Sequence, residues 1–163
     1  MSALEELLRA NSLYASYFTK GQLAAAPARR FAVVTCMDAR IDPAKALGLE
    51  EGDAHVIRNA GGLVTDDALR SLAISHWELG THEVFVVAHT RCGMLALDNE
   101  DLRRKIGDAA TRVDFLPFRD LDTSVRESVR RVRESPLLPD SYGATGMVYD
   151  VESGRIRVVG DLA

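Results

Sequence analysis

The chain has 163 residues, of which 47% are hydrophobic and 27% charged, with a formal net charge of −4 at pH 7. This size and composition are typical of one soluble globular domain and exclude a disordered or fibrous chain. The pI near 5.6 gives no basic footprint for nucleic acid, and no apolar run approaches the roughly 20 residues of a membrane span. Glutamates in the first turn of the chain do not fit a secretory signal, so we expect a cytoplasmic protein.

An amphipathic helix is predicted at the N-terminus, followed by an A-A-A-P-A linker at residues 24–28. Such a helix must bury its apolar stripe on its own domain or on a partner. The stripe is interrupted near Asn11 and consists of Leu4, Leu7, Leu8, Leu13, Tyr14, Tyr17 and Phe18. We therefore treat residues 1–28 as a helical arm and linker of a single domain that spans residues 1–163.

Short apolar runs at residues 31–35, 54–57 and 84–88 predict strands covered on both faces. Between the last two, a helix is predicted to begin after Thr65, with two aspartates in its first turn, and to end at Gly80. A later helix carries its stripe at Leu121, Val125, Val129 and Val132, and M-V-Y-D-V, E-S-G and R-I-R-V-V predict a terminal hairpin. This alternation predicts an α/β fold: a mostly parallel central sheet flanked by helices, with an N-terminal helical arm and a C-terminal hairpin.

Both cysteines of the chain follow predicted strands. Cys36 begins the segment C-M-D-A-R, and if the strand stays extended there, Cys36, Asp38 and Arg40 point to one face. The third strand ends in His89, and Cys92 follows after the turn T-R. Because ligands bind at the carboxyl ends of parallel strands, we expect these side chains to meet at one edge of the sheet.

Two thiols and an imidazole are ligands that zinc takes in tetrahedral sites, where a catalytic ion keeps one exchangeable position. Cys36, His89 and Cys92 supply three ligands, and Asp38 or water supplies the fourth. Two other interpretations remain open. In the first, each cysteine is simply a small buried apolar residue. In the second, the two cysteines form a redox pair, although no C-x-x-C motif is present.

Three motifs carry a resemblance to a known family. In this order and at these separations, C-M-D-A-R, R-N-A-G-G (58–62) and H-T-R-C-G-M (89–94) resemble the β-class carbonic anhydrases, from about Phe31 through the terminal hairpin. The sequence is similar to the short bacterial branch, which also includes carbonyl sulfide hydrolases. The resemblance implies one zinc ion per chain on the two cysteines and the histidine, a catalytic Asp38–Arg40 dyad, and a homodimer or higher homo-oligomer embraced by the N-terminal helices.

The expected activity is reversible hydration of carbon dioxide to bicarbonate by zinc-bound hydroxide, oriented by Asp38 that Arg40 keeps ionised. One alternative is hydrolysis of carbonyl sulfide, another small uncharged substrate, to hydrogen sulfide and carbon dioxide. A second is a non-catalytic zinc scaffold, in which Asp38 closes the site as fourth ligand. Arg40 beside Asp38 favours an enzyme, because a purely structural site needs no such partner.

The substrate pocket is expected to involve His55, Ala60, Gly61 and Gly93. His55 and Ala60 stand where the plant-type pattern has a phenylalanine and a valine, so the resemblance leaves the substrate open. The glycine run lies between a strand and a helix, where backbone N–H groups can bind an anion, although a tight turn with positive φ is the more frequent role. We also consider His55 as a proton shuttle to solvent.

Overall fold

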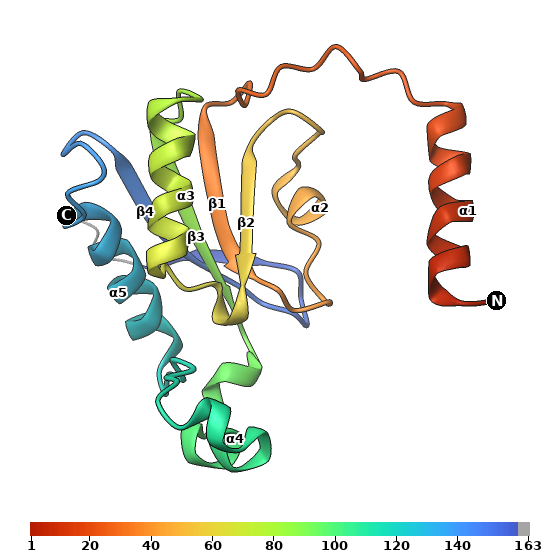
Figure 1. Cartoon of the computed structure of the whole chain (residues 1–163). Helices are drawn as coiled ribbons and strands as arrows, with labels where there is room; N and C mark the ends of the chain where they lie inside the picture. The colour runs from red at the N-terminus through yellow and green to blue at the C-terminus, as the bar shows by residue number, and fades with distance from the viewer. Residues whose placement is uncertain (160–163) are drawn as a thin grey trace.

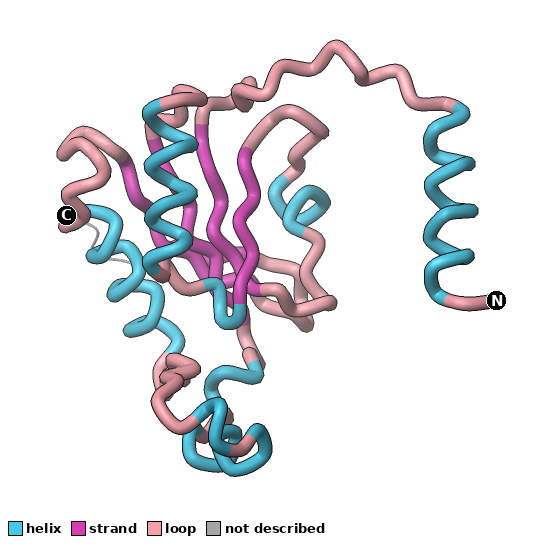
Figure 2. The backbone as a smooth tube through the Cα atoms, in the orientation of Figure 1, coloured by secondary structure: helices cyan, strands magenta, loops and turns pink. Residues whose placement is uncertain are grey.

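The computed structural model describes residues 1–159. Within this range helices and strands alternate and are joined by turns and by longer loops, the longest of which leads from α1 to β1 (Figures 1 and 2). In chain order they are α1 (Ala3–Ser16), β1 (Phe31–Cys36), α2 (Pro43–Leu47), β2 (His55–Asn59), η1 (Ala60–Gly62), α3 (Asp66–Trp77), β3 (Glu83–His89), η2 (Gly93–Leu95), α4 (Asn99–Ile106), η3 (Asp108–Ala110), α5 (Leu121–Arg133), β4 (Gly143–Tyr149) and β5 (Ile156–Val158).

The strands form one sheet in the order β2-β1-β3-β4-β5. The β1–β2, β1–β3 and β3–β4 pairs are parallel, and only β4–β5 is antiparallel. The prediction of a mostly parallel sheet that ends in a hairpin is therefore confirmed. Because β1 and β3 are neighbours, the segments that follow them leave the sheet side by side.

The core lies on both faces of this sheet, because successive residues of a strand point to opposite faces. All six residues of β1 are buried. Ala32 and Val34 pack on the face covered by α3 and α5, together with Leu72 of α3 and Val129 of α5. Phe31, Val33 and Val87 form the other face, where Leu47 of α2 packs. The flanking helices thus hold β1 in place from both sides.

The helix of the N-terminal arm is not packed into the core of its own domain. α1 runs from Ala3 to Ser16, and a capping box between Ser2 and Glu5 stabilises its first turn. No residue of α1 is buried. Figure 1 shows the helix standing apart from the sheet at the end of a long connection. Within residues 1–159 the leucines of α1 therefore stay exposed, and Tyr14 contacts the domain through a hydrogen bond to Glu51 at 2.7 Å.

Strand β2 is longer than the predicted segment 54–57. It continues through Arg58 and Asn59, which pair with Thr35 and Cys36 of β1. As an edge strand, β2 leaves alternate side chains exposed, so its polar residues do not end it. The short helices α2 and α4 were not predicted. No helix within residues 1–159 is both long and apolar enough to cross a membrane.

Candidate metal centre

The candidate metal ligands come from two neighbouring strands. Cys36 is the last residue of β1 and His89 the last of β3, and Cys92 follows one turn later. Their ligand atoms, two Sγ and an imidazole nitrogen, all lie within 4.8 Å of one another, and all three residues are buried. The structure therefore brings together the three residues that the sequence singled out.

His89 presents one ring nitrogen to this group. Its Nδ1 lies 2.9 Å from the carbonyl oxygen of Thr90, which only accepts, so Nδ1 carries the proton. Nε2 is buried and has no hydrogen-bond partner among the described residues. Burial lowers the pKa of His89 and keeps the ring neutral. A buried nitrogen with a free lone pair is the donor that a metal ion requires.

The two cysteines are free thiols rather than a disulfide. Burial raises the pKa of Cys92 to about 11, and a hydrogen bond from the backbone N–H of Met94 acts against this rise. A divalent cation reverses such a shift, since a thiol that coordinates a metal loses its proton. Two sulfurs and one nitrogen at this spacing fit zinc, whose bonds to sulfur are about 2.3 Å and to nitrogen about 2.0–2.1 Å.

Asp38 and Arg40 form a bidentate ion pair beside the ligands. Arg40 Nε lies 2.9 Å from Asp38 Oδ1, and Arg40 Nη2 lies 2.7 Å from Oδ2. These hydrogen bonds, and one from the Arg40 backbone N–H, hold the pKa of Asp38 well below its usual range. Asp38 Oδ2 lies 3.7 Å from His89 Nε2, so an ionised carboxylate faces the position that the ligand atoms surround.

The segment that carries this pair is a turn and not a continuation of the strand. β1 ends at Cys36, and the Arg40 backbone N–H donates to Asp38 Oδ1 at 2.9 Å. The expected extended geometry from Cys36 to Arg40 is therefore corrected. An aspartate that accepts a hydrogen bond from the backbone two residues later stabilises a turn instead of a strand.

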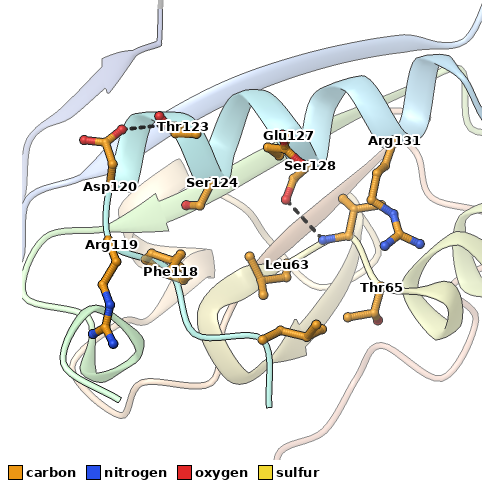
Figure 3. Close-up of a pocket in the computed structure, with 12 residues that line it drawn as sticks. Leu63, Thr65, Phe118, Arg119, Asp120, Thr123, Ser124, Glu127, Ser128 and Arg131 are labelled. Carbon is orange, nitrogen blue, oxygen red and sulfur yellow. Dashed lines mark hydrogen bonds between the residues drawn. The ribbon is translucent and has the colours of Figure 1, made fainter. Parts of the chain in front are cut away.

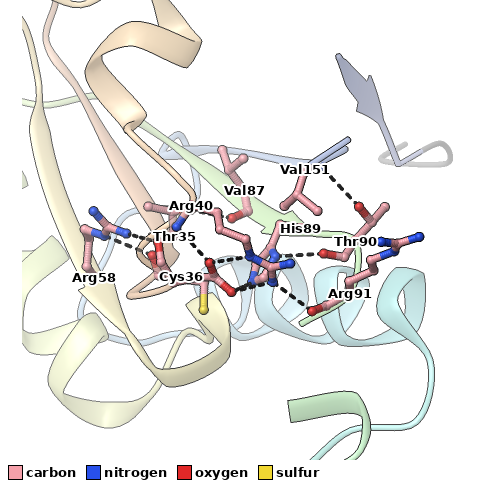
Figure 4. Close-up of polar contacts among 10 residues, drawn as sticks. Thr35, Cys36, Arg40, Arg58, Val87, His89, Thr90, Arg91 and Val151 are labelled. Carbon is pink, nitrogen blue, oxygen red and sulfur yellow. Dashed lines mark hydrogen bonds and ion pairs between the residues drawn. The ribbon is translucent and has the colours of Figure 1, made fainter. Parts of the chain in front are cut away.

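Two further contacts of this centre were not predicted. The guanidinium of Arg58, on β2, donates to the carbonyl oxygens of Cys36 at 2.9 Å and Asp38 at 2.8 Å. Arg40 Nη2 also donates to the carbonyl of Arg91 at 3.0 Å, so it connects the two ligand-bearing segments (Figure 4). The sequence feature that could have indicated this role of Arg58 is its position at the start of the R-N-A-G-G motif.

The glycines after β2 serve close packing. Gly61 and Gly62 both have positive φ, and a Cβ on Gly62 would lie 2.8 Å from the backbone nitrogen of Cys36. A Cβ on Gly61 would lie 3.2 Å from Met94 Cγ, so η1 packs against η2 beside the ligands. Ala60, which begins η1, and Gly93, which begins η2, are exposed at this edge of the sheet.

The structure does not bring His55 to this centre. It pairs with Ala32, whereas Cys36 pairs with Asn59, so His55 lies four residues away along β2, about 13 Å at the rise of a strand. Its Nδ1 contacts Ser75 Oγ at 2.7 Å, and its Nε2 contacts the Ala25 carbonyl at 3.3 Å. The ring thus connects α3 to the linker at the amino end of the sheet.

A groove of about 430 Å³ lies between α5 and the segment that precedes α3 (Figure 3). Its apolar floor includes Leu63 and Phe118, and Ser128 Oγ accepts a hydrogen bond from the Val64 backbone at 3.3 Å. None of the candidate ligands lines it. Phe118 lies between this groove and the candidate metal centre, because it lines the groove and also packs against the cluster that contains Cys36 and Cys92.

A parallel α/β sheet whose carboxyl edge gathers two thiols, an imidazole and an arginine-bound carboxylate defines a metal-binding protein of the Cys-His-Cys type. Residues 31–115 match the family model described as carbonic anhydrase. The chain belongs to the carbonic anhydrase family, and its relatives place it in the β class.

Three relatives show the extent of this similarity. The β-carbonic anhydrase 1 of Mycobacterium tuberculosis is 43% identical over 162 residues, which cover 98% of this chain and 99% of that protein. The crystal structure of a carbonic anhydrase from Streptococcus mutans is 45% identical and superposes with a TM-score of 0.92 over 98% of this chain and 99% of the other. A carbon disulfide hydrolase of Acidianus sp. is 36% identical over 156 residues, covering 79% of this chain and 76% of that protein.

Proposed function

We propose that this protein catalyses the reversible hydration of carbon dioxide to bicarbonate, with one zinc ion per chain on Cys36, His89 and Cys92. The observation that carries the proposal is the convergence of these three ligand atoms within 4.8 Å. The ionised Asp38 at 3.7 Å from His89 Nε2 adds a hydrogen-bond acceptor beside them. Family membership and the mycobacterial relative support the same reaction.

A zinc ion held by Cys36, His89 and Cys92 would act as a Lewis acid and lower the pKa of bound water. Asp38 accepts a hydrogen bond from the attacking water and so turns a lone pair of that water toward the carbon of a linear, uncharged substrate. Each carboxylate oxygen accepts more than one hydrogen bond, so Asp38 can do this while it remains paired with Arg40. Arg40 keeps Asp38 ionised and fixes its orientation. The surrounding Ile41, Met94 and Phe118 keep bulk water out of the site.

The Asp38–Arg40 pair also decides whether a coordination position stays open. Arg40 holds both carboxylate oxygens of Asp38, so this carboxylate would not be free to bind the ion in place of water. Without the pair, Asp38 could bind the ion and would exclude water from it. A non-catalytic zinc scaffold would require Asp38 on the ion in the resting protein. The intact Asp38–Arg40 ion pair therefore favours an enzyme over a scaffold.

The test is stopped-flow carbon dioxide hydration against pH on the zinc-loaded protein, with zinc content measured on the same sample. Cys92→Ser is the control, because it removes one ligand and leaves Asp38 and Arg40 in place. We expect activity that increases with pH in the wild type and is lost in the variant. One zinc ion per chain with no hydration at any pH would reject the proposed reaction.

Hydrolysis of carbonyl sulfide is a second candidate for the same site. The 36% identity to a carbon disulfide hydrolase favours it, since that protein is named for another linear sulfur-containing substrate. The same zinc-loaded samples are therefore tested with carbonyl sulfide, and released sulfide is measured. Sulfide release that exceeds carbon dioxide hydration under matched conditions would make carbonyl sulfide the preferred substrate.

We further propose that two or more copies of the chain assemble through the N-terminal arm. The apolar residues of α1 are all exposed, and Leu4, Leu7 and Leu13 are each about two thirds exposed. Exposed apolar stripes of this kind mark contact surfaces. Sedimentation velocity should give at least a dimer for the full chain and a smaller species after deletion of the first 20 residues. An unchanged sedimentation profile would reject assembly through the arm.

A further inference from the structure

The segment between His89 and Cys92 is held from outside by the C-terminal hairpin. The Thr90 backbone N–H donates to the Tyr149 carbonyl at 2.9 Å. The Thr90 hydroxyl donates to Asp150 Oδ1 at 3.2 Å. It also accepts a hydrogen bond from the Val151 backbone N–H at 3.1 Å (Figure 4). Both the main chain and the side chain of Thr90 are therefore fixed by the β4–β5 connection.

Asp150 is itself held in place by its own turn. Its Oδ1 accepts the Glu152 backbone N–H at 2.9 Å, and its Oδ2 accepts the Ser153 hydroxyl at 2.9 Å. The backbone of the same residue closes the turn through hydrogen bonds with Arg155 and Gly154, both at 2.8 Å. The carboxylate that receives the Thr90 hydroxyl is thus a rigid acceptor rather than a mobile surface group.

The carbonyl groups that follow in the chain face the metal centre. Thr90 O accepts the Nδ1 proton of His89 at 2.9 Å, and Arg91 O accepts Arg40 Nη2 at 3.0 Å. Arg91 has φ of 55°, a left-handed conformation that is unfavourable for a residue with a side chain. Such a conformation persists only where neighbouring contacts enforce it. Those contacts include the Thr90 hydrogen bonds and an ion pair of Arg91 with Glu152 at 2.9 Å.

We propose that Thr90 and Asp150 are positioning residues of the metal centre: the hairpin carboxylate, through the Thr90 hydroxyl, fixes the carbonyl that binds His89 Nδ1–H and so presents Nε2 to the metal. Neither residue touches the ligand atoms, and each acts through the peptide group between Thr90 and Arg91. The inference rests on the proposed zinc site.

Thr90 can influence metal binding because the peptide group between Thr90 and Arg91 becomes more mobile when the Thr90 hydroxyl is removed. If Thr90 loses its hydrogen bonds to Asp150 and Val151, Arg91 can leave the left-handed region and the Thr90 carbonyl turns away from the imidazole. His89 then has no fixed acceptor for Nδ1–H, and its other tautomer and other ring orientations become accessible. Removing an outer partner of a metal ligand commonly lowers metal affinity about 10–100-fold.

The test compares zinc affinity among variants by competition with a chromophoric chelator at neutral pH, together with the visible spectrum of the cobalt-substituted protein. Thr90→Val removes the hydroxyl and keeps the β-branched shape, and Thr90→Ser restores the hydroxyl. Asp150→Ala removes the acceptor, and the double variant with Thr90→Val tests whether the two act through each other. Thr111→Val is the matched control, because Thr111 is exposed and its hydroxyl donates to the nearby Asp108 carbonyl at 2.8 Å.

We expect Thr90→Val and Asp150→Ala each to lose about tenfold or more in zinc affinity and to change the cobalt spectrum, with little further loss in the double variant. Thr90→Ser and Thr111→Val should bind zinc as the wild type does. Thermal unfolding of each metal-free variant separates these effects from stability. A lower melting temperature for Thr90→Val or Asp150→Ala, with unchanged zinc affinity and spectrum, would overturn the inference. Failure of the wild type itself to bind zinc would instead reject the proposed site.

Discussion

Replacing Gly62 with alanine is expected to destabilise the protein by about 2–5 kcal/mol. The new Cβ would lie 2.8 Å from the Cys36 nitrogen and 2.9 Å from the Thr35 carbonyl carbon, both backbone atoms of a buried strand that has no room to move. The left-handed φ of 65° costs an alanine about 1–2 kcal/mol. Overpacking adds about 1–3 kcal/mol. For a protein of this size the sum corresponds to a melting temperature lower by roughly 4–20 °C.

Gly48→Ala is the matched control, since Gly48 has nearly the same φ, 62°, and no atom lies within 4 Å of the Cβ it would gain. It should show the conformational cost alone. Thermal unfolding of both metal-free variants measures the difference, and zinc competition on the same samples should show weaker binding only for Gly62→Ala, because its clash displaces Cys36. Equal melting temperatures for the two variants would refute the argument that close approach to β1 requires a glycine.

Leu72→Ala should destabilise the protein by about 2–5 kcal/mol in urea unfolding, because this leucine is fully buried between α3 and the sheet; a loss below 1 kcal/mol would contradict the described core. Asp38→Asn tests the ion pair through pH: the depressed pKa of Asp38 means that its contribution is fully present above the unfolded value of about 3.9 and is lost as pH falls toward the folded value. The difference in urea stability between wild type and Asp38→Asn should stay constant down to about pH 5 and shrink below it, whereas a difference that grows with acid would be inconsistent with the pair. His55→Ala should leave the rate of carbon dioxide hydration at low buffer concentration unchanged, because His55 and Asn59 lie at opposite ends of β2 and Asn59 is the residue that pairs with Cys36. A marked loss of rate would assign His55 a role that its position does not explain.

Much of the fold was predictable because its strands are short continuous apolar runs and its longer helices begin at clear caps. Phe31–Cys36 and Glu83–His89 are buried on both faces, so their composition alone indicates parallel strands. The longer extent of β2 was not predictable, because Arg58 and Asn59 are polar residues of an edge strand and are held there by pairing with β1. The five residues of α2 are too few to show a period.

The candidate ligands were predictable from their positions after strands, since the carboxyl ends of adjacent parallel strands meet at one edge of the sheet. The contacts that support them were not. Arg58 on β2 donates to the carbonyls of Cys36 and Asp38, about twenty positions earlier, and Thr90 donates to Asp150, sixty positions later. Such pairings depend on the register of distant strands, which no local pattern records.

The origin of the ligands in two separate strands has a consequence for how the protein acquires its metal. Cys36 and His89 meet only once β1 has paired with β3, so an unfolded or nascent chain offers no preformed chelate. Zinc fingers couple metal uptake to folding, because without the ion their small cores do not hold. Here the apolar clusters on the two faces of the sheet contain none of the ligands. We therefore expect the sheet to fold first and the ends of its two strands to bind the ion afterwards.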